Sequence, residues 1–225
     1  MADPIIVFKN VTRKFMVGAD EVTALANASC VIHAGDRIAV MGPSGSGKST
    51  LMALMAQLDT PSSGSISWPK FPSAESVRPK YIGLSFQSPS LMAALTALEN
   101  VEVPMLVLER DSEARGKALE MLQVFGLEHL SDRLPEELSG GQAQRIAMAR
   151  ALVTSPVLIL ADEPTGQLDQ ETGQSVIRKL VEISNATGAA LLIATHDAAI
   201  AAEMNTVWHM RYGALDVSNM KRTAL

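Results

Sequence analysis

The sequence of 225 residues has a single cysteine, no excess of basic residues and no long apolar run. Cys30 has no partner for an internal disulfide, which excludes a disulfide-stapled scaffold and predicts a buried thiol. The 19 Lys and Arg residues against 24 Asp and Glu give a net charge of −5, which argues against broad contact with nucleic acid. No apolar run approaches the ~18 residues of a membrane span, and the opening Met-Ala-Asp-Pro lacks the basic-then-apolar order of a signal peptide. We therefore expect a chain that stays on the cytoplasmic side.

Hydrophobic residues make up 47% of the chain, which is ample for a buried core. Short apolar runs alternate with longer helical patterns, the order expected of an α/β fold with a mostly parallel sheet covered by helices. Four runs are predicted as its strands: Arg37 to Met41, Tyr81 to Phe86, Val157 to Ala161, and Ala190 to Thr195. The last two are continuously apolar, as central strands buried on both faces should be.

Two other regions carry different patterns. Residues Ile5 to Lys9 and Thr23 to Ile32 predict strands of a separate antiparallel sheet, joined by a turn near Gly18. Between Leu91 and Leu130 the apolar residues follow a helical spacing, which predicts an inserted helical lobe.

The segment GPSGSGKST follows a predicted strand and precedes a helical pattern. It fits G-x-x-x-x-G-K-[ST], a loop whose backbone amides wrap around nucleotide phosphates. Lys48 would reach the terminal phosphates, and Ser49 would place its hydroxyl on Mg²⁺. The positive end of the following helix would point at the same anion. The alternative, a chance Gly/Ser loop, is disfavoured by these flanks. The predicted nucleotide-binding residues are Gly42, Pro43, Ser44, Gly45, Ser46, Gly47, Lys48, Ser49 and Thr50.

Two adjacent carboxylates, Asp162 and Glu163, follow the apolar strand that ends at Ala161. Ligands of open parallel sheets bind beyond the carboxyl ends of the strands, so both acids should emerge beside the phosphate loop. Asp162 suits the Mg²⁺ shell, and Glu163 suits the positioning and deprotonation of an attacking water. A capped strand end with solvated acids is the alternative reading of this pair taken alone.

A second anion site is predicted at Leu138 to Gln142, LSGGQ, where a serine and two glycines open the helical stretch Ala143 to Val153. In isolation this is a common turn. One nucleotide scarcely needs two phosphate sites from one chain, so a symmetric pair is implied in which each chain completes its partner's pocket.

With these motifs the chain resembles the nucleotide-binding ATPase subunit of an ABC transporter over almost its full length. The phosphate loop matches the Walker A segment, Leu138 to Gln142 the signature motif, and Val157 to Glu163 the Walker B strand with its catalytic glutamate. In family order, Gln87 falls at the Q-loop, Gly166 to Asp169 at the D-loop, and His196 at the switch histidine.

The resemblance implies roles for these residues. His196 would contact the γ-phosphate, and Gln87 would sense both Mg²⁺ and the permease. ATP would also be bound by Ser139, Gly140, Gly141 and Gln142, and Asp169 would help to couple the two chains. Phe15 would stack on adenine, although the family more often has tyrosine there and a core phenylalanine is nearly as well supported.

Two segments, Leu95 to Pro104 and Ala161 to Gly173, resemble the branch of macrolide-exporter, lipoprotein-releasing and cell-division ATPases. Two features depart from that branch: Gln167 stands in the D-loop where Asn is usual, and the segment from Ser65 to Lys80 is shorter than usual. Neither departure removes a catalytic group.

The resemblance implies a P-loop NTPase fold of the ABC type across residues 1–225, with an antiparallel β subdomain and a helical subdomain at about 88–153. Its expected activity is ATP hydrolysis with ATP and Mg²⁺, in a dimer of chains, with homodimer the simplest case. That dimer would drive a separate transmembrane permease from the cytoplasmic face of the membrane, in export or force transmission. The alternative is a regulatory ATPase that transmits force through a membrane protein to an extracytoplasmic enzyme without transport. A soluble ABC ATPase of DNA repair or translation is disfavoured, because no coiled-coil insertion or second tandem domain is evident.

Overall fold

The computed structural model describes residues 4–71, 80–109 and 113–218 of the chain. The strands are β1 (Pro4–Val17), β2 (Asp20–His33), β3 (Arg37–Met41), β4 (Ser63–Ser67), β5 (Ile82–Ser85), β6 (Leu158–Asp162), β7 (Ala190–Thr195), β8 (Thr206–Arg211) and β9 (Ala214–Asp216). The α-helices are α1 (Lys48–Met55), α2 (Ala97–Glu109), α3 (Ala114–Val124), α4 (Gly140–Leu152), α5 (Gln170–Thr187) and α6 (Ala198–Ala202). Half of the segment expected to be short, residues 72–79, lies outside the described residues.

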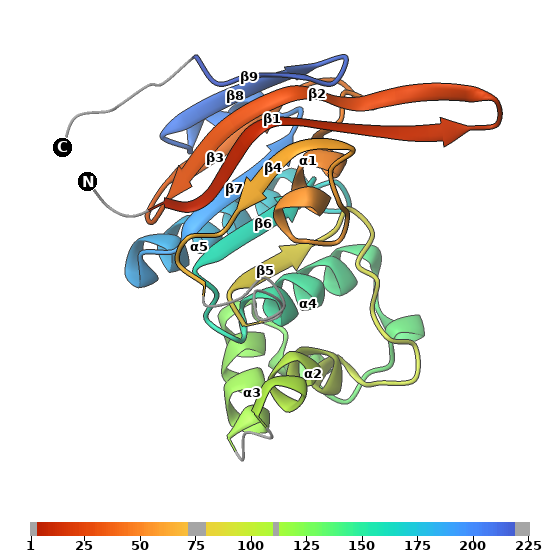
Figure 1. Cartoon of the computed structure of the whole chain (residues 1–225). Coiled ribbons are helices and arrows are strands. Elements are labelled where there is room, and N and C mark those ends of the chain that lie inside the picture. Colours follow the sequence, from red (N-terminus) through yellow and green to blue (C-terminus); the bar gives the residue numbers. More distant parts are fainter. Residues whose placement is uncertain (1–3, 72–79, 110–112, 219–225) are drawn as a thin grey trace.

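The predicted parallel strands form one half of the sheet (Figure 1). The order β8-β3-β7-β6-β5 is parallel throughout, and β6 and β7 lie in its interior with every residue buried. The prediction of two central strands is therefore confirmed. Because all five strands run the same way, the residues that follow β3, β6 and β7 meet at one edge of the sheet.

The antiparallel region differs from expectation in one respect. β1 pairs antiparallel with β2 and β4, and a turn at Gly18 joins β1 to β2, as predicted. The expectation of a separate sheet is wrong: a parallel bridge between Ala26 and Ala214 joins β2 to β9 and makes one nine-stranded sheet. That bridge depends on β9, whose three residues are too few to show a pattern.

The β1–β2 hairpin is also longer than its apolar pattern predicts, and it projects from the body of the protein (Figure 1). Its outer residues Met16, Val17 and Val22 are exposed, so the inside–outside alternation that identifies a strand stops before the hairpin ends.

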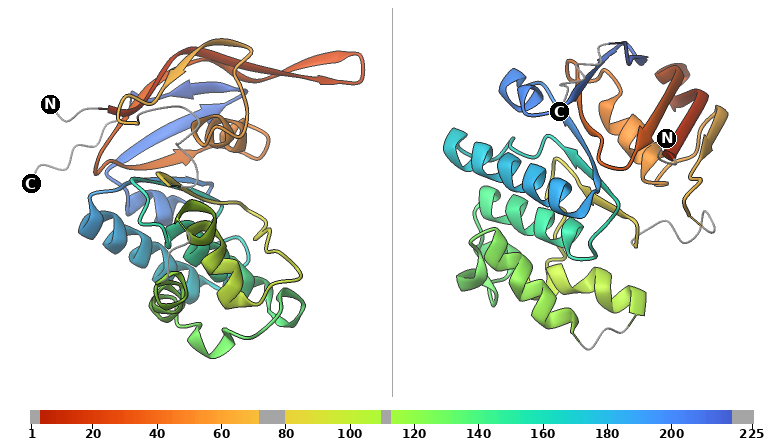
Figure 2. Two further views of the ribbon diagram at one scale, coloured as in Figure 1. Left: turned by 60° about the horizontal axis from the view of Figure 1, so that its bottom comes forward. Right: turned by 90° about the vertical axis from the view of Figure 1, so that its left-hand side faces the viewer.

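Two hydrophobic cores lie on the two faces of the parallel strands. In one, α1 lies between these strands and the antiparallel ones, as Figure 2 shows, and Leu51 and Met55 pack with Phe8 and Val40. In the other, α4, α5 and α6 cover the opposite face, which includes Ala39, and α2 and α3 pack in turn on α4. The sheet thus curls around α1, and this fixes the loop that precedes α1 against the sheet.

The helical lobe begins later than its pattern suggests, because residues 91–96 form turns before α2 starts at Ala97. The helix predicted from Ala143 begins at Gly140 instead. Ser139 caps it: Ser139 Oγ accepts from the Gln142 amide at 3.2 Å, and Gln142 Oε1 accepts from the Ser139 amide at 2.8 Å. Within the described part of the chain, no helix combines the length and apolarity needed to cross a membrane.

Candidate nucleotide site

The phosphate loop is shaped by backbone contacts that exclude larger side chains. A Cβ atom at Gly42 would lie 2.2 Å from the Met210 carbonyl oxygen, and one at Gly47 would lie 2.2 Å from that of Ala24. Gly47 also adopts φ 106°, a left-handed conformation that favours glycine, at the N-cap of α1. No side chain of the described residues caps this helix. Its first amides therefore stay available to an anion.

Lys48 is held inside the loop that precedes it. Its side chain is only 6% exposed, and Nζ donates to the Gly42 carbonyl at 2.8 Å and to the Pro43 carbonyl at 3.1 Å. The same nitrogen lies 3.9 Å from Glu163 Oε1. The ammonium is thus fixed at the mouth of the loop. A terminal phosphate bound there would replace some of its present partners, which are the two backbone carbonyls and the Glu163 carboxylate.

Asp162 ends β6 and is buried next to Ser49 and Lys48. Burial raises the pKa of this carboxyl above its usual range, and the neighbouring Glu163 charge adds to the rise. A hydrogen bond with Ser49 and the charge of Lys48 act in the opposite direction. Because this carboxylate is buried, a cation bound beside it would stabilise its charged form.

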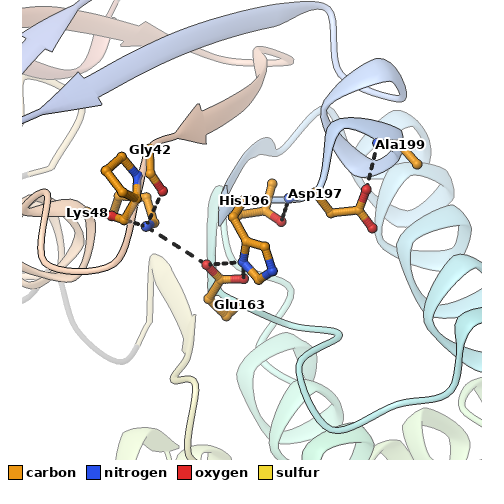
Figure 3. A network of polar contacts seen from close by, with 8 residues as sticks. Gly42, Lys48, Glu163, His196, Asp197 and Ala199 are labelled. Carbon is orange, nitrogen blue, oxygen red and sulfur yellow. Dashed lines mark hydrogen bonds and ion pairs between the residues drawn. The ribbon is translucent and has the colours of Figure 1, made fainter.

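Glu163 and His196 face each other across the edge of the sheet (Figure 3). His196 Nδ1 lies 3.1 Å from Glu163 Oε1 and 3.0 Å from Oε2. Glu163 has φ 46°, an uncommon conformation for a residue with a side chain, and its amide donates to the Ala194 carbonyl at 2.9 Å. This backbone conformation next to β7 directs the Glu163 carboxylate toward Lys48 and His196.

These groups line a cleft of about 580 Å³. Its walls include Ser44, Gly45 and residues 47–50 of the phosphate loop, the acid pair, Gln87 and His196, whereas Gly42, Pro43 and Ser46 do not line it. Four segments far apart in the sequence, predicted separately, thus converge on one cavity that holds an ammonium, two carboxylates, hydroxyls and free amides. This set of groups binds and cleaves phosphoanhydrides.

Comparisons with known proteins agree with this geometry. The family model described as "ABC transporter" matches residues 25–166. The chain belongs to the ABC transporter family. It is an ATP-binding protein and an ATPase of the ABC type with the α/β fold of ABC cassettes, as the sequence predicts.

Relatives and solved structures extend the match. The lipoprotein-releasing system ATP-binding protein LolD of Psychrobacter arcticus is 44% identical over 208 residues, which cover 88% of this chain and 92% of that protein. The dimeric post-hydrolysis structure of the ATP-binding cassette MJ0796 with ADP and Pi has TM-score 0.90 and 35% identity, covering 97% of this chain and all of that one. CbiO1 of Clostridium perfringens, part of the transporter complex CbiONQ, has TM-score 0.81 and 29% identity, covering 98% of this chain and 90% of its own.

The signature segment of this ABC ATPase lies apart from the cleft. Within the part of the chain that the structure describes, none of residues 139–142 lines the cavity that contains Lys48. The segment instead contacts the D-loop: a Cβ atom at Gly140 would lie 2.5 Å from Gln167 Oε1, and one at Gly141 would lie 2.9 Å from Leu168 Cδ2. Gln167, the residue that departs from the related branch, therefore packs against the signature glycines of its own chain.

Three other placements bear on the sequence predictions. Phe15 is 37% exposed, does not line the cleft, and has the Arg13 guanidinium carbon 4.5 Å from its ring centroid. Asp169 caps α5 by accepting from the Thr172 amide at 2.9 Å, a bond that lowers its pKa, and it lines a second cleft of about 490 Å³. Ala24 lines the nucleotide cleft although the sequence analysis missed it, since only the packing of β2 against Gly47 places it there.

The residues present fit Mg²⁺. A hydroxyl and one carboxylate, Ser49 and Asp162, share a hydrogen bond beside the phosphate loop. Mg²⁺ is usually held by one or two protein oxygens together with phosphates and waters. The described residues contain no group of three or more His, Cys, Asp or Glu side chains that could hold a metal ion.

Proposed function

We propose that two copies of this chain enclose two Mg-ATP molecules and drive a separate transmembrane permease, in export or in force transmission. The observation that carries the proposal is the separation of the signature segment from the nucleotide cleft of its own chain. A capped helix start with two glycines would form a second anion site, and it lies outside the nucleotide cleft of its own chain. A symmetric partner would bring it to the γ-phosphate, and the dimeric structure of the similar cassette MJ0796 supports a two-chain arrangement.

In the proposed cycle each group of the cleft has one task. Lys48 would exchange its carbonyl partners for the terminal phosphates, and Glu163 would exchange His196 for the attacking water, whose proton it accepts. His196 would then donate to the γ-phosphate, and Gln87 would contact the metal shell. Bound Mg²⁺, held by Ser49 and Asp162, would neutralise charge on the β- and γ-phosphates.

The partner and location follow from the relatives rather than from the cleft. A relative named as part of a lipoprotein-releasing system supports a membrane permease as partner and a position on the cytoplasmic face of the membrane. We further propose that residues 1–225 act as one ATPase domain, in which residues 88–153 form the helical subdomain that meets the permease.

The test uses the tagged Glu163→Gln chain, with Glu182→Gln, an exposed acid on α5, as the matched control. With Mg-ATP, Glu163→Gln should elute at twice the monomer mass and should co-purify with a permease from native membranes, because the trapped nucleotide keeps the two chains together. The control should return to monomer as ATP is consumed.

The outcome separates the possible roles. A permease together with a transported substrate supports transport, whereas a membrane protein bound to an extracytoplasmic enzyme supports force transmission. A chain that binds Mg-ATP but stays monomeric with the permease present would contradict the two-chain arrangement. ATP-dependent dimers without any membrane protein would contradict the permease.

A further inference from the structure

The β1–β2 hairpin is set against the phosphate loop by a bulge. The pairing of the two strands shifts between Arg13 and Lys14, which leaves Ala24 of β2 as an extra residue. Ala24 lines the nucleotide cleft, and a Cβ atom at Gly47 would lie 2.2 Å from its carbonyl oxygen. The part of the hairpin that projects from the protein therefore begins at the wall of the cleft (Figure 1).

Two apolar side chains continue this wall outward along the hairpin. Val22 lies two residues from Ala24 on β2, so the alternation of a strand puts both side chains on the same face. Phe15 pairs with Val22 across the hairpin and shares that face. Two residues of a strand span about 7 Å. The Phe15 ring thus lies beyond the cleft by a distance comparable with the ribose that separates the phosphates of a nucleotide from its base.

Arg13 covers part of the Phe15 ring. Its guanidinium carbon lies 4.5 Å from the ring centroid, which is a cation–π contact. A ring near the end of a hairpin would otherwise be free to change rotamer, and the stacked guanidinium restricts that freedom. The ring nevertheless remains 37% exposed, so a ligand can still stack on it.

Arg13 is held in turn by the segment that follows α1. Arg13 Nε donates to Asp59 Oδ2 at 2.8 Å, and Arg13 Nη2 lies 2.7 Å from Asp59 Oδ1. Two parallel contacts of this kind fix the plane of the guanidinium. Ser62 bonds to the residues on both sides of Arg13: its amide donates to the Thr12 carbonyl at 2.8 Å, and its Oγ accepts from the Lys14 amide at 3.0 Å. The arginine is therefore fixed at its backbone and at its head group.

We propose that Arg13, held by Asp59, is a positioning residue that keeps the Phe15 ring where the base of a nucleotide bound in the cleft stacks on it. The inference rests on the proposed function, in which the phosphate loop holds ATP. A ring that is already fixed loses less conformational entropy when the base binds. Because Arg13 acts through Phe15, its removal should weaken binding of the base and leave binding of the phosphates unchanged.

The experiment compares Mg-ADP with Mg-pyrophosphate, which has the same two phosphates but no adenosine. Calorimetric titration of the full chain gives both dissociation constants without turnover. The variants are Arg13→Met, Arg13→Lys and Asp59→Asn, together with Phe15→Leu and the double variant Arg13→Met/Phe15→Leu. Arg115→Met is the matched control, because it removes an exposed arginine of α3 that lies 3.7 Å from an acid, Glu102.

Arg13→Met should weaken ADP binding about tenfold and leave pyrophosphate binding within about twofold of the parent. Asp59→Asn should weaken ADP binding about threefold, because the guanidinium keeps the ring but loses its charged partner. Arg13→Lys should also cost about threefold, since an ammonium can contact the ring but lacks the planar fork. In the Phe15→Leu chain, Arg13→Met should cause no further loss, because no ring is left to position. The control should match the parent for both ligands.

Equal losses of ADP and pyrophosphate affinity in Arg13→Met would show a merely structural role and would overturn the inference. Parental ADP affinity in that variant, or additive losses from Arg13→Met and Phe15→Leu, would do the same. Failure of the proposed function shows separately, as a parent chain that binds neither ligand. A parent that binds ADP no more tightly than pyrophosphate overturns the inference alone. If Arg13→Met does not fold, Arg13→Lys carries the test, since it keeps the charge and most of the side chain.

Discussion

The two phosphate-binding segments of this chain are built in opposite ways. The site at the phosphate loop is enclosed: Lys48 and Asp162 are each 6% exposed, and the glycines contact neighbouring backbone. A bound ligand of opposite charge would offset the cost of burying these two groups. The signature segment is more open: Ser139 and Gly140 are exposed, and Ser139 and Gln142 satisfy each other in a capping box. The first is a site within one chain, and the second is, in the proposed dimer, a surface that meets the partner chain. On the proposed function, this difference predicts that a folded monomer binds ATP yet hydrolyses it poorly.

Lys48→Ala should break the enclosed site and produce the largest effect. Loss of the ammonium removes a charge-assisted contact with the terminal phosphates, so ATP affinity should fall at least ~100-fold, about 2.7 kcal/mol. Titration with a fluorescent ATP analogue measures this, with Lys9→Ala, an exposed lysine on β1, as control. Parental affinity in Lys48→Ala would refute the phosphate-loop assignment.

Ser139→Ala should affect only the exposed segment. We expect ATP affinity within twofold of the parent and hydrolysis reduced about tenfold or more, since the N-cap and one phosphate donor are lost together.

Mixing Ser139→Ala with Lys48→Ala chains sharpens the same comparison. If each signature segment serves the partner's nucleotide, the mixed dimer has one doubly defective site and one intact site, and hydrolysis should recover in part. Without any recovery, the signature segment would act within its own chain.

Asp162→Asn tests the electrostatic cost of the enclosed site. Because burial raises the pKa of this carboxyl, its proton binds more tightly in the folded state, and stability is lost as pH rises through the folded pKa. The variant should therefore melt at a higher temperature than the parent at pH 7, by about 2–4 °C for each kcal/mol that the substitution adds to the free energy of unfolding. The difference should vanish as the pH falls toward 4. A lower melting temperature at pH 7, measured by calorimetry without nucleotide, would contradict the raised pKa.

Gln167→Asn should have the smallest effect. The shorter side chain withdraws from Gly140, so the D-loop and the signature segment lose one contact, and we expect a less than threefold change in hydrolysis with a melting temperature within about 2 °C. A larger loss of hydrolysis at unchanged ATP affinity would show that this contact sets the geometry between the two sites.

The sequence by itself determined the parts whose chemistry is local. The glycines, Lys48 and Ser49 identify a phosphate loop because few residues permit that backbone, and continuous apolar runs identify β6 and β7 because both faces are buried. The order of motifs was sufficient to identify the family and to place Asp162, Glu163 and His196 at one edge of the sheet.

Only the tertiary structure decided what depends on distant contacts. The bridge from Ala26 to Ala214 that makes one sheet, the strained φ of Glu163, and the hydrogen bond from Gln144 on α4 to the Phe86 carbonyl leave no local signal. Each involves backbone groups, which every residue type carries alike, so the sequence around them does not show which distant group each of them meets.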